Sequence, residues 1–172
     1  PYDGTDLVTM TGEIRTPLGA MDVDDMAARY LCRTSACEMA PRRIGQTAGP
    51  YLTALMLQAT GWDGSVLPVG LPRELDDGVP AALLDVCDDA TVCLTADLTH
   101  GDTEEAVQRQ DRELLAALED GHVPDDLPLQ DRTGFRACAL LDRFHGLRRF
   151  GHSTVPTDGG YTGIGAFCTD AL

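Results

Sequence analysis

The stretch ATVCLTADLTHG, residues 90–101, decides the fold that the sequence predicts. Its first part, Ala90–Ala96, is a nearly continuous apolar run, which is typical of a strand buried on both faces of a sheet. Asp97 and His100 follow directly, so we expect them at the carboxyl end of that strand, where open α/β sheets place their functional sites. The carboxylate can orient the imidazole, which can then act as an acid or a base near neutral pH. On spacing alone, a loop-capping Asp97 and a solvated His100 explain the pattern equally well.

Helical and extended patterns alternate on both sides of this strand. The clearest helix covers Glu104–Glu119, where apolar residues recur at helical spacing and acids crowd the first turn. Further helices are expected over Asp25–Arg33, from Pro50 to Gly61, over Asp76–Cys87 and over Thr133–Phe144, and further strands over Thr5–Thr11, Ser65–Gly70 and Tyr161–Cys168. This order predicts an α/β fold with a mixed, mostly parallel central sheet and helices on both faces, as a single domain over residues 1–172.

The charge of the chain restricts its partners. The 172 residues carry 28 acidic and 13 basic side chains, a net charge of −15. Such a field repels phosphate backbones and anionic lipids, which argues against nucleic acid and membrane surfaces as partners. No uninterrupted apolar run approaches the roughly eighteen residues of a membrane span, and no signal peptide is visible. The six cysteines form no C-x-x-C motif. We therefore expect a cytoplasmic protein with no obligatory disulfides.

Four segments resemble, in order, motifs of the Memo-like proteins and class III extradiol dioxygenases. TADLTHGD, starting at Thr95, resembles the strand end "S-[SG]-D-[LF]-[SC]-H" of that superfamily. The others are Glu13–Gly19 with Val23-Asp24, which resembles "TPLG…vD"; Pro50–Leu52 with Val66–Gly70, which resembles "LPFL…ivPilvG"; and Gly160–Phe167, which resembles "dYs.vvGYa". Together they cover essentially the whole chain. The resemblance implies a non-haem iron oxygenase that acts on a phenolic or related small molecule.

The resemblance also implies roles for individual residues. His100 corresponds to the acid/base that deprotonates a catechol hydroxyl, and Asp97 would orient it. His152 and Ser153 fall on a segment that approaches the same pocket in the family, so we expect them to contact the substrate. Arg43 is a third substrate-binding candidate, because an arginine fork pairs well with a carboxylate. The alternative for Arg43 is a local balance of charge on a very acidic surface.

The sequence departs from the family at its metal site. The first strand and two histidine segments of the family would lie before Pro1, which suggests a trimmed or incomplete front end. The "EHSIE" motif falls on Pro41–Gly45, and "ICGRHP" falls near Asp131–Arg136, without the ligands in either case. Cys138 is nearby, but we interpret it as a core thiol. We therefore predict no metal ligand in this chain, and Fe(II), if used, would take ligands from outside it.

This departure leaves a second functional hypothesis open. The chain would then be a non-catalytic, degenerate subunit or binding module that lacks metal and pairs with another chain. A partner subunit or a homo-oligomer is expected in either case, because an unpaired sheet edge rarely stays open. His122 and His145 are interpreted as a solvated and a structural histidine.

Overall fold

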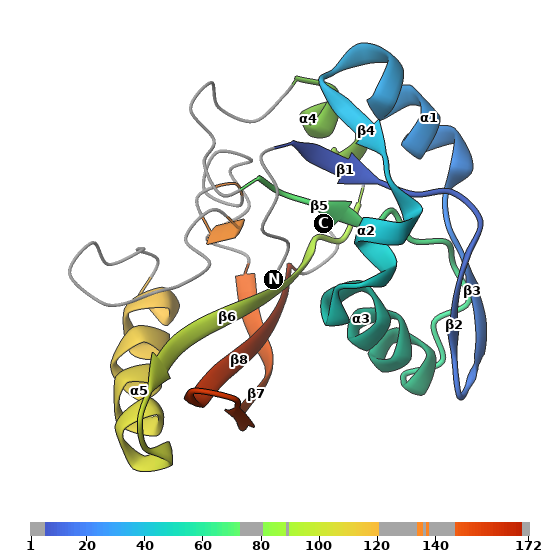
Figure 1. The fold of residues 1–172 in the computed structure, drawn as a ribbon. Helices are drawn as coiled ribbons and strands as arrows, with labels where there is room; N and C mark the ends of the chain where they lie inside the picture. The colour runs from blue at the N-terminus through green and yellow to red at the C-terminus, as the bar shows by residue number, and fades with distance from the viewer. Residues whose placement is uncertain are drawn as a thin grey trace. The chain divides into compact units, whose positions relative to one another are not determined.

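The computed structural model describes residues 6–72, 81–88, 90–120, 134–135, 137 and 147–169 of the chain. The chain divides into two compact units, which we call the first unit (Pro1–Asp89) and the second unit (Ala90–Leu172). Each unit combines strands with helices, as Figure 1 shows. The chain therefore has the mixed α/β character that the sequence predicts. Its description as a single domain over residues 1–172 stays a prediction.

The first unit is built around a three-stranded sheet with the order β4-β1-β5. Its elements are β1 (Leu7–Thr9), β2 (Glu13–Thr16), β3 (Gly19–Asp22), α1 (Asp25–Thr34), β4 (Cys37–Met39), α2 (Pro41–Gly45), α3 (Ala48–Ala59), β5 (Val69–Gly70) and α4 (Ala81–Cys87). Neighbouring side chains in a strand point to opposite faces. Leu7 packs with residues of α1 and α4, whereas Val8 packs with Ile44 of α2. Helices therefore lie on both faces of this sheet (Figure 1).

Short-range signals fix two further features of the first unit. Asp24 caps α1, since its Oδ1 accepts a hydrogen bond from the backbone nitrogen of Ala27 at 2.9 Å. The antiparallel strands β2 and β3 form a hairpin with only Pro17-Leu18 in its loop. The apolar side of that hairpin packs on α3. The sequence analysis did not identify this hairpin.

The second unit contains an antiparallel sheet with the order β6-β8-β7. Its elements are β6 (Cys93–Gly101), α5 (Glu104–Glu119), β7 (Leu147–Thr157) and β8 (Gly160–Thr169). The loop between β7 and β8 is only Asp158-Gly159, because Thr157 pairs with Gly160. Gly160 has φ +137°, and a Cβ there would lie 2.4 Å from the carbonyl oxygen of Gly101. Only glycine fits this turn without rearrangement.

Helix α5 packs on one face of this sheet and closes the core of the second unit. Its first turn is capped by Thr103, whose hydroxyl accepts a hydrogen bond from the nitrogen of Ala106 at 3.3 Å. The core combines the apolar stripe of α5 with side chains of β6 and β8 and with Phe135; its buried members are Ala96, Leu98, Leu114, Leu115, Leu118, Phe135 and Phe167. The rings of Phe135 and Phe167 meet edge to face, with centroids 5.1 Å apart.

Two sequence predictions about the sheet are wrong for the described strands. The central sheet is not mostly parallel: apart from the β1–β4 pair and an isolated bridge between Val23 and Val66, the described pairings are antiparallel. Two-residue loops account for the β2–β3 and β7–β8 pairs, because such loops can join only antiparallel neighbours. Asp97 and His100 do not follow β6 but lie inside it, since the strand continues to Gly101.

Candidate functional site

A break in strand register brings Asp97 and His100 to one face of the β6-β8-β7 sheet. Asp97 lies opposite Ile164 of β8, His100 lies opposite Thr162, and β6 is irregular between the two. Paired residues of antiparallel strands share a face, and so do positions two apart in one strand. Asp97 and His100 therefore share a face, although a regular strand would place residues three apart on opposite faces. We call this surface the Asp97 face.

The register also assigns the two β7 candidates to faces. Ser153 lies opposite Ile164, so it shares the Asp97 face, two strands away from Asp97 and at a distance of roughly 10 Å. His152 lies opposite Gly165, which places it on the other face, the one covered by α5. The structure thus brings Asp97, His100 and Ser153 to one surface and does not bring His152 to it.

The ring of His100 is exposed and is held by a threonine. Its Nδ1 lies 3.1 Å from Oγ1 of Thr162, its partner across the β6–β8 ladder, and Thr162 is buried. When Nδ1 carries the proton and donates it to this hydroxyl, Nε2 keeps a lone pair that can accept a proton. The hydroxyl of Thr162 therefore occupies the orienting position that the sequence analysis assigned to Asp97. The role of Asp97 stays a prediction.

The α5-covered face of the sheet carries a polar network that the sequence analysis did not predict. Asp111 of α5 is fully buried, and its Oδ1 accepts a hydrogen bond from the hydroxyl of Thr99 at 2.5 Å. Its Oδ2 lies 2.6 Å from Nε2 of His152, whose side chain is 22% exposed. The carboxylate fits there because Gly163 has no side chain: a Cβ on that residue would lie 1.9 Å from Oδ2. One carboxylate therefore links α5 to all three strands.

The signal for this network was present but unspecific. Asp111 lies four residues after Val107 and three before Leu114, on the apolar stripe of α5 that packs on the sheet. An acid on such a stripe indicates a buried carboxylate with partners. Those partners, Thr99 and His152, lie on separate strands, so helical periodicity could not identify them.

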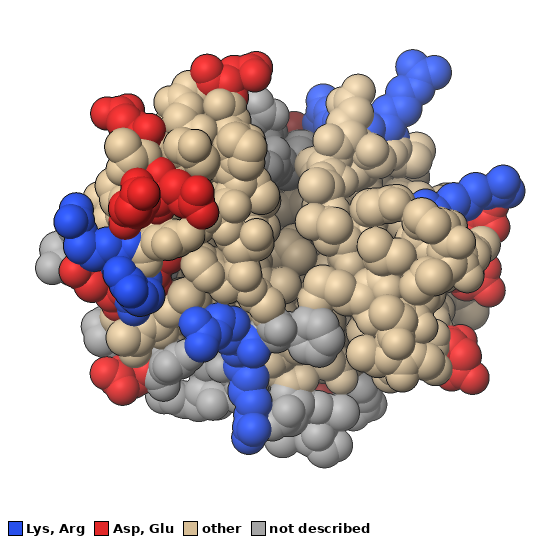
Figure 2. Space-filling view, turned by 90° about the horizontal axis from the view of Figure 1, so that it is seen from below, with Lys and Arg blue, Asp and Glu red and all other residues tan. Residues whose placement is uncertain are grey.

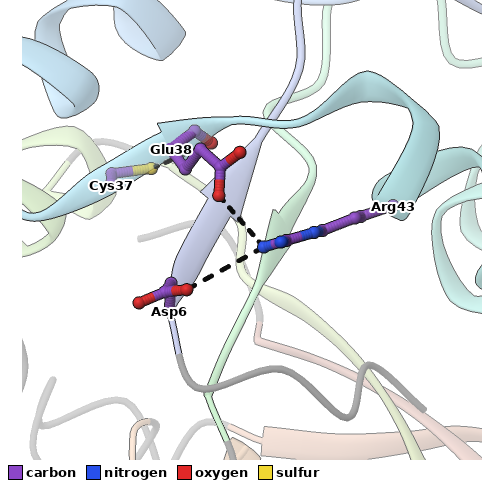
Figure 3. A network of polar contacts seen from close by, with 4 residues as sticks. All are labelled: Asp6, Cys37, Glu38 and Arg43. Carbon is purple, nitrogen blue, oxygen red and sulfur yellow. Dashed lines mark hydrogen bonds and ion pairs between the residues drawn. The ribbon is translucent and has the colours of Figure 1, made fainter.

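Arg43, the remaining predicted substrate ligand, pairs with carboxylates of its own unit. Its Nη1 lies 3.0 Å from Oε2 of Glu38 and 3.9 Å from Oδ2 of Asp6, as Figure 3 shows. All three side chains are about half exposed, and salt bridges of this kind contribute roughly 1 kcal/mol or less. This geometry matches the local charge balance considered for Arg43, and its role in binding a substrate stays a prediction.

The described residues do not provide the ligands of a metal site. No group of three or more His, Cys, Asp or Glu side chains that could hold a metal ion occurs among them. His122, His145, Cys138 and the helix expected over Thr133–Phe144 lie outside the described residues, except for residues 134–135 and 137, which are helical. The prediction that Fe(II) would take ligands from outside this chain stays untested.

Comparisons with protein-family models, with curated proteins and with solved structures found no match for this chain. Within the part of the chain that the structure describes, no helix combines the length and apolar character needed to cross a membrane. Figure 2 shows arginine and acidic side chains interspersed on the face that it displays.

Proposed function

We propose that the Asp97 face is an acid/base site for a phenolic or related small molecule, within an oxygenase that resembles the Memo-like and class III extradiol proteins. One observation carries the proposal: the irregularity in β6 gives Asp97 and the exposed His100 the same face, which Ser153 shares. The resemblance of residues 95–102 to the family's Asp/His strand end supports the same residues.

The chemistry assigned to this chain is a proton transfer. The Nε2 atom of His100 accepts the proton of a phenolic hydroxyl, while Nδ1 donates to Thr162. Thr162 fixes the ring because it is buried and lies directly across the ladder. Ser153, an exposed residue of β7 on the same face, could hydrogen-bond a second polar group of the ligand. Asp97 adds a carboxylate to the same face.

The oxygenase part of this proposal requires an iron ion, which the described residues do not accommodate. They contain no three-ligand group of His, Cys, Asp or Glu, so ligands from elsewhere would have to complete an Fe(II) site. We therefore derive only the proton transfer from this chain and no step that involves the metal. A partner subunit, or a second copy of the chain, is one source of such ligands.

The proton transfer is tested with 4-nitrocatechol, a phenol whose visible absorption reports ionisation of its hydroxyl groups. We expect the full chain to bind it and to shift its absorption toward the ionised form. His100→Gln should abolish this protein-induced shift, because a glutamine side chain has no nitrogen lone pair that can accept the hydroxyl proton. Thr162→Val should weaken the shift by a smaller factor. The matched control is Asp102→Asn, which changes an exposed acid two residues from His100.

Two results would refute the proposal. One is an unchanged absorption shift in His100→Gln, and the other is the absence of any binding to the full chain. The second result would favour the non-catalytic alternative, a binding module that pairs with another chain. Sedimentation of the same sample would then show whether the chain associates with itself.

A further inference from the structure

Two cysteines lie directly opposite each other in the β6–β8 ladder. Cys93 pairs with Cys168 in the register, and their sulfur atoms are 2.9 Å apart. Both side chains are free thiols and are half-buried. They are 75 positions apart in the sequence, so no short-range pattern relates them. The contact does not depend on the function proposed above.

The backbone geometry at this pair is compatible with a disulfide bond. Directly opposed residues of antiparallel strands have Cα atoms about 4.5 or 5.5 Å apart, depending on the type of pair. Disulfides are found at Cα separations of about 4.4 to 6.8 Å. The sulfur atoms would need to approach by about 0.9 Å to reach the bond length of roughly 2.05 Å. A small rotation of the side chains supplies this movement without a change in the strands.

We propose that Cys93 and Cys168 are a site of reversible oxidation, at which a small-molecule disulfide such as oxidised glutathione converts the two thiols into a cross-strand disulfide. The Cys168 thiolate attacks one sulfur of the oxidant, which forms a mixed disulfide and releases one glutathione thiolate. Cys93, after losing its proton to solvent, then attacks the Cys168 sulfur and releases the second glutathione thiolate. Two protein thiols are oxidised, one glutathione disulfide is reduced to two thiols, and the protons balance.

The protonation of the pair supports this order of events. The hydrogen-bonding contact with Cys93 lowers the pKa of the Cys168 thiol, while partial burial opposes the change. The same contact raises the pKa of Cys93, and desolvation adds to that rise. Cys168 is therefore the first nucleophile, because the thiolate and not the thiol attacks a disulfide. Cys93 becomes the attacking group only when Cys168 carries the glutathione.

The disulfide would join the first residue of β6 to the second-last residue of β8. Cys93 lies four positions before Asp97 with no irregularity between them, so it shares the Asp97 face. The ends of the two strands are already linked, because Val92 and Thr169 exchange two hydrogen bonds of 3.0 and 2.9 Å. Oxidation would thus add a covalent link to a strand pair that the reduced chain holds by hydrogen bonds and core packing.

The proposal is tested by peptide mapping, in a variant in which each linked peptide contains a single cysteine. Trypsin cleaves after arginine and leaves Cys93 on a peptide that also contains Cys87, so the full chain is prepared as Cys87→Ala. This protein is equilibrated with buffers of increasing oxidised-to-reduced glutathione ratio, alkylated, digested and analysed by mass spectrometry. We expect peptides 74–109 and 150–172 to become linked, with the loss of two hydrogen atoms, and reduction to reverse the link.

Further variants distinguish the proposed order of attack from random oxidation. With Cys93→Ser, Cys168 should accumulate as the glutathione adduct, because no second thiol displaces it. With Cys168→Ser, Cys93 should form its adduct at least tenfold more slowly. A chain in which peptides 74–109 and 150–172 stay unlinked at every glutathione ratio would overturn the proposal. Preferential linkage of either cysteine to Cys138 would overturn it as well.

Discussion

Replacing Gly163 by alanine should disrupt the buried carboxylate network of the second unit. A Cβ at this position would lie 1.9 Å from Oδ2 of Asp111 and 2.5 Å from both Oδ1 and Cγ. Real Cβ atoms essentially never lie within 3.0 Å of such a neighbouring heavy atom. The carboxylate would therefore have to move by about 1 Å or more, away from a strand that it now contacts closely. Its hydrogen bonds to Thr99 and His152, now 2.5 and 2.6 Å, cannot both survive that movement.

The loss of stability in Gly163→Ala can be estimated from the hydrogen bonds that the displaced carboxylate of Asp111 would lose. Overpacking in a core typically costs about 1–3 kcal/mol, and leaving a buried carboxylate without its partners costs about 3–5 kcal/mol. Because one movement causes both effects, we expect the free energy of unfolding to fall by about 3–5 kcal/mol rather than by the full sum. That is a large fraction of the roughly 5–15 kcal/mol by which domains are stable. Gly159→Ala is the matched control, since a Cβ there meets nothing within 4 Å.

A double-mutant cycle isolates the contact between the two residues. Asp111→Ala alone should destabilise by a similar amount, because it leaves His152 and Thr99 without their buried partner. In that background Gly163→Ala should cost less than about 1 kcal/mol, since the three atoms nearest to the new methyl group are gone. The coupling energy should therefore be at least about 2 kcal/mol. Additive losses in the double variant would refute the assignment of the clash to this carboxylate.

The measurement has to report on the second unit. The single tryptophan, Trp62, belongs to the first unit, so its fluorescence follows the wrong part of the chain. Hydrogen exchange of peptides from residues 90–120 and 147–169, monitored by mass spectrometry in increasing urea, reports on β6, α5, β7 and β8. Protection should be lost in those peptides at lower urea in Gly163→Ala than in Gly159→Ala.

Three further predictions concern single groups. Asp24→Ala should lower stability by about 1 kcal/mol, because α1 loses its N-terminal cap; urea unfolding monitored by Trp62 fluorescence checks this. Thr99→Val should cost about 1–3 kcal/mol, because the buried carboxylate loses a donor that water cannot replace; hydrogen exchange in β6 should detect it, and unchanged protection would contradict it. Burial raises the pKa of Cys37 to about 12, so the folded state favours its protonated thiol. The rate of alkylation of Cys37 should therefore rise about tenfold for each pH unit between roughly pH 8 and pH 11. Cys168, whose pKa is lowered, should react first; equal rates for the two thiols would count against these assignments.

Elements that depend on short-range signals could be predicted from the sequence. Helix α5 was expected over Glu104–Glu119 and has those bounds, because a threonine cap, acids in the first turn and a continuous apolar stripe all act locally. The same holds for α1, which was expected over Asp25–Arg33 and covers Asp25–Thr34. Two large apolar side chains of the expected helices are nevertheless exposed, Met26 at 82% and Leu84 at 42%. The spacing of apolar residues identified these helices, but it did not show which apolar side chains at the border of each apolar stripe are buried.

Elements that depend on distant partners could not be predicted. Strand β7 reads LRRFGHSTVPT, with neither an apolar run nor a regular alternation. It is extended because it pairs with β8 along its whole length, and its register is irregular between Arg149 and Gly151. The irregularity in β6 has the same origin: nothing in TADLTHG requires an extra residue between Asp97 and His100. The shared face of these residues is therefore a consequence of pairing, which the sequence alone did not reveal.

The two histidines of the sheet should respond differently to substitution, because their rings lie on opposite faces. Nε2 of His152 is engaged by a buried carboxylate, so His152→Gln should lower the stability of the second unit by about 1–3 kcal/mol. His100 is exposed and its ring hydrogen-bonds the hydroxyl of Thr162, so His100→Gln should change stability by less than about 1 kcal/mol. The absorption shift of 4-nitrocatechol toward its ionised form should show the reverse order, because His100→Gln should reduce this shift more than His152→Gln does. If His152→Gln abolished ligand ionisation at unchanged stability, the chemistry would belong to the α5-covered face, and the Asp97 face would lose its assignment.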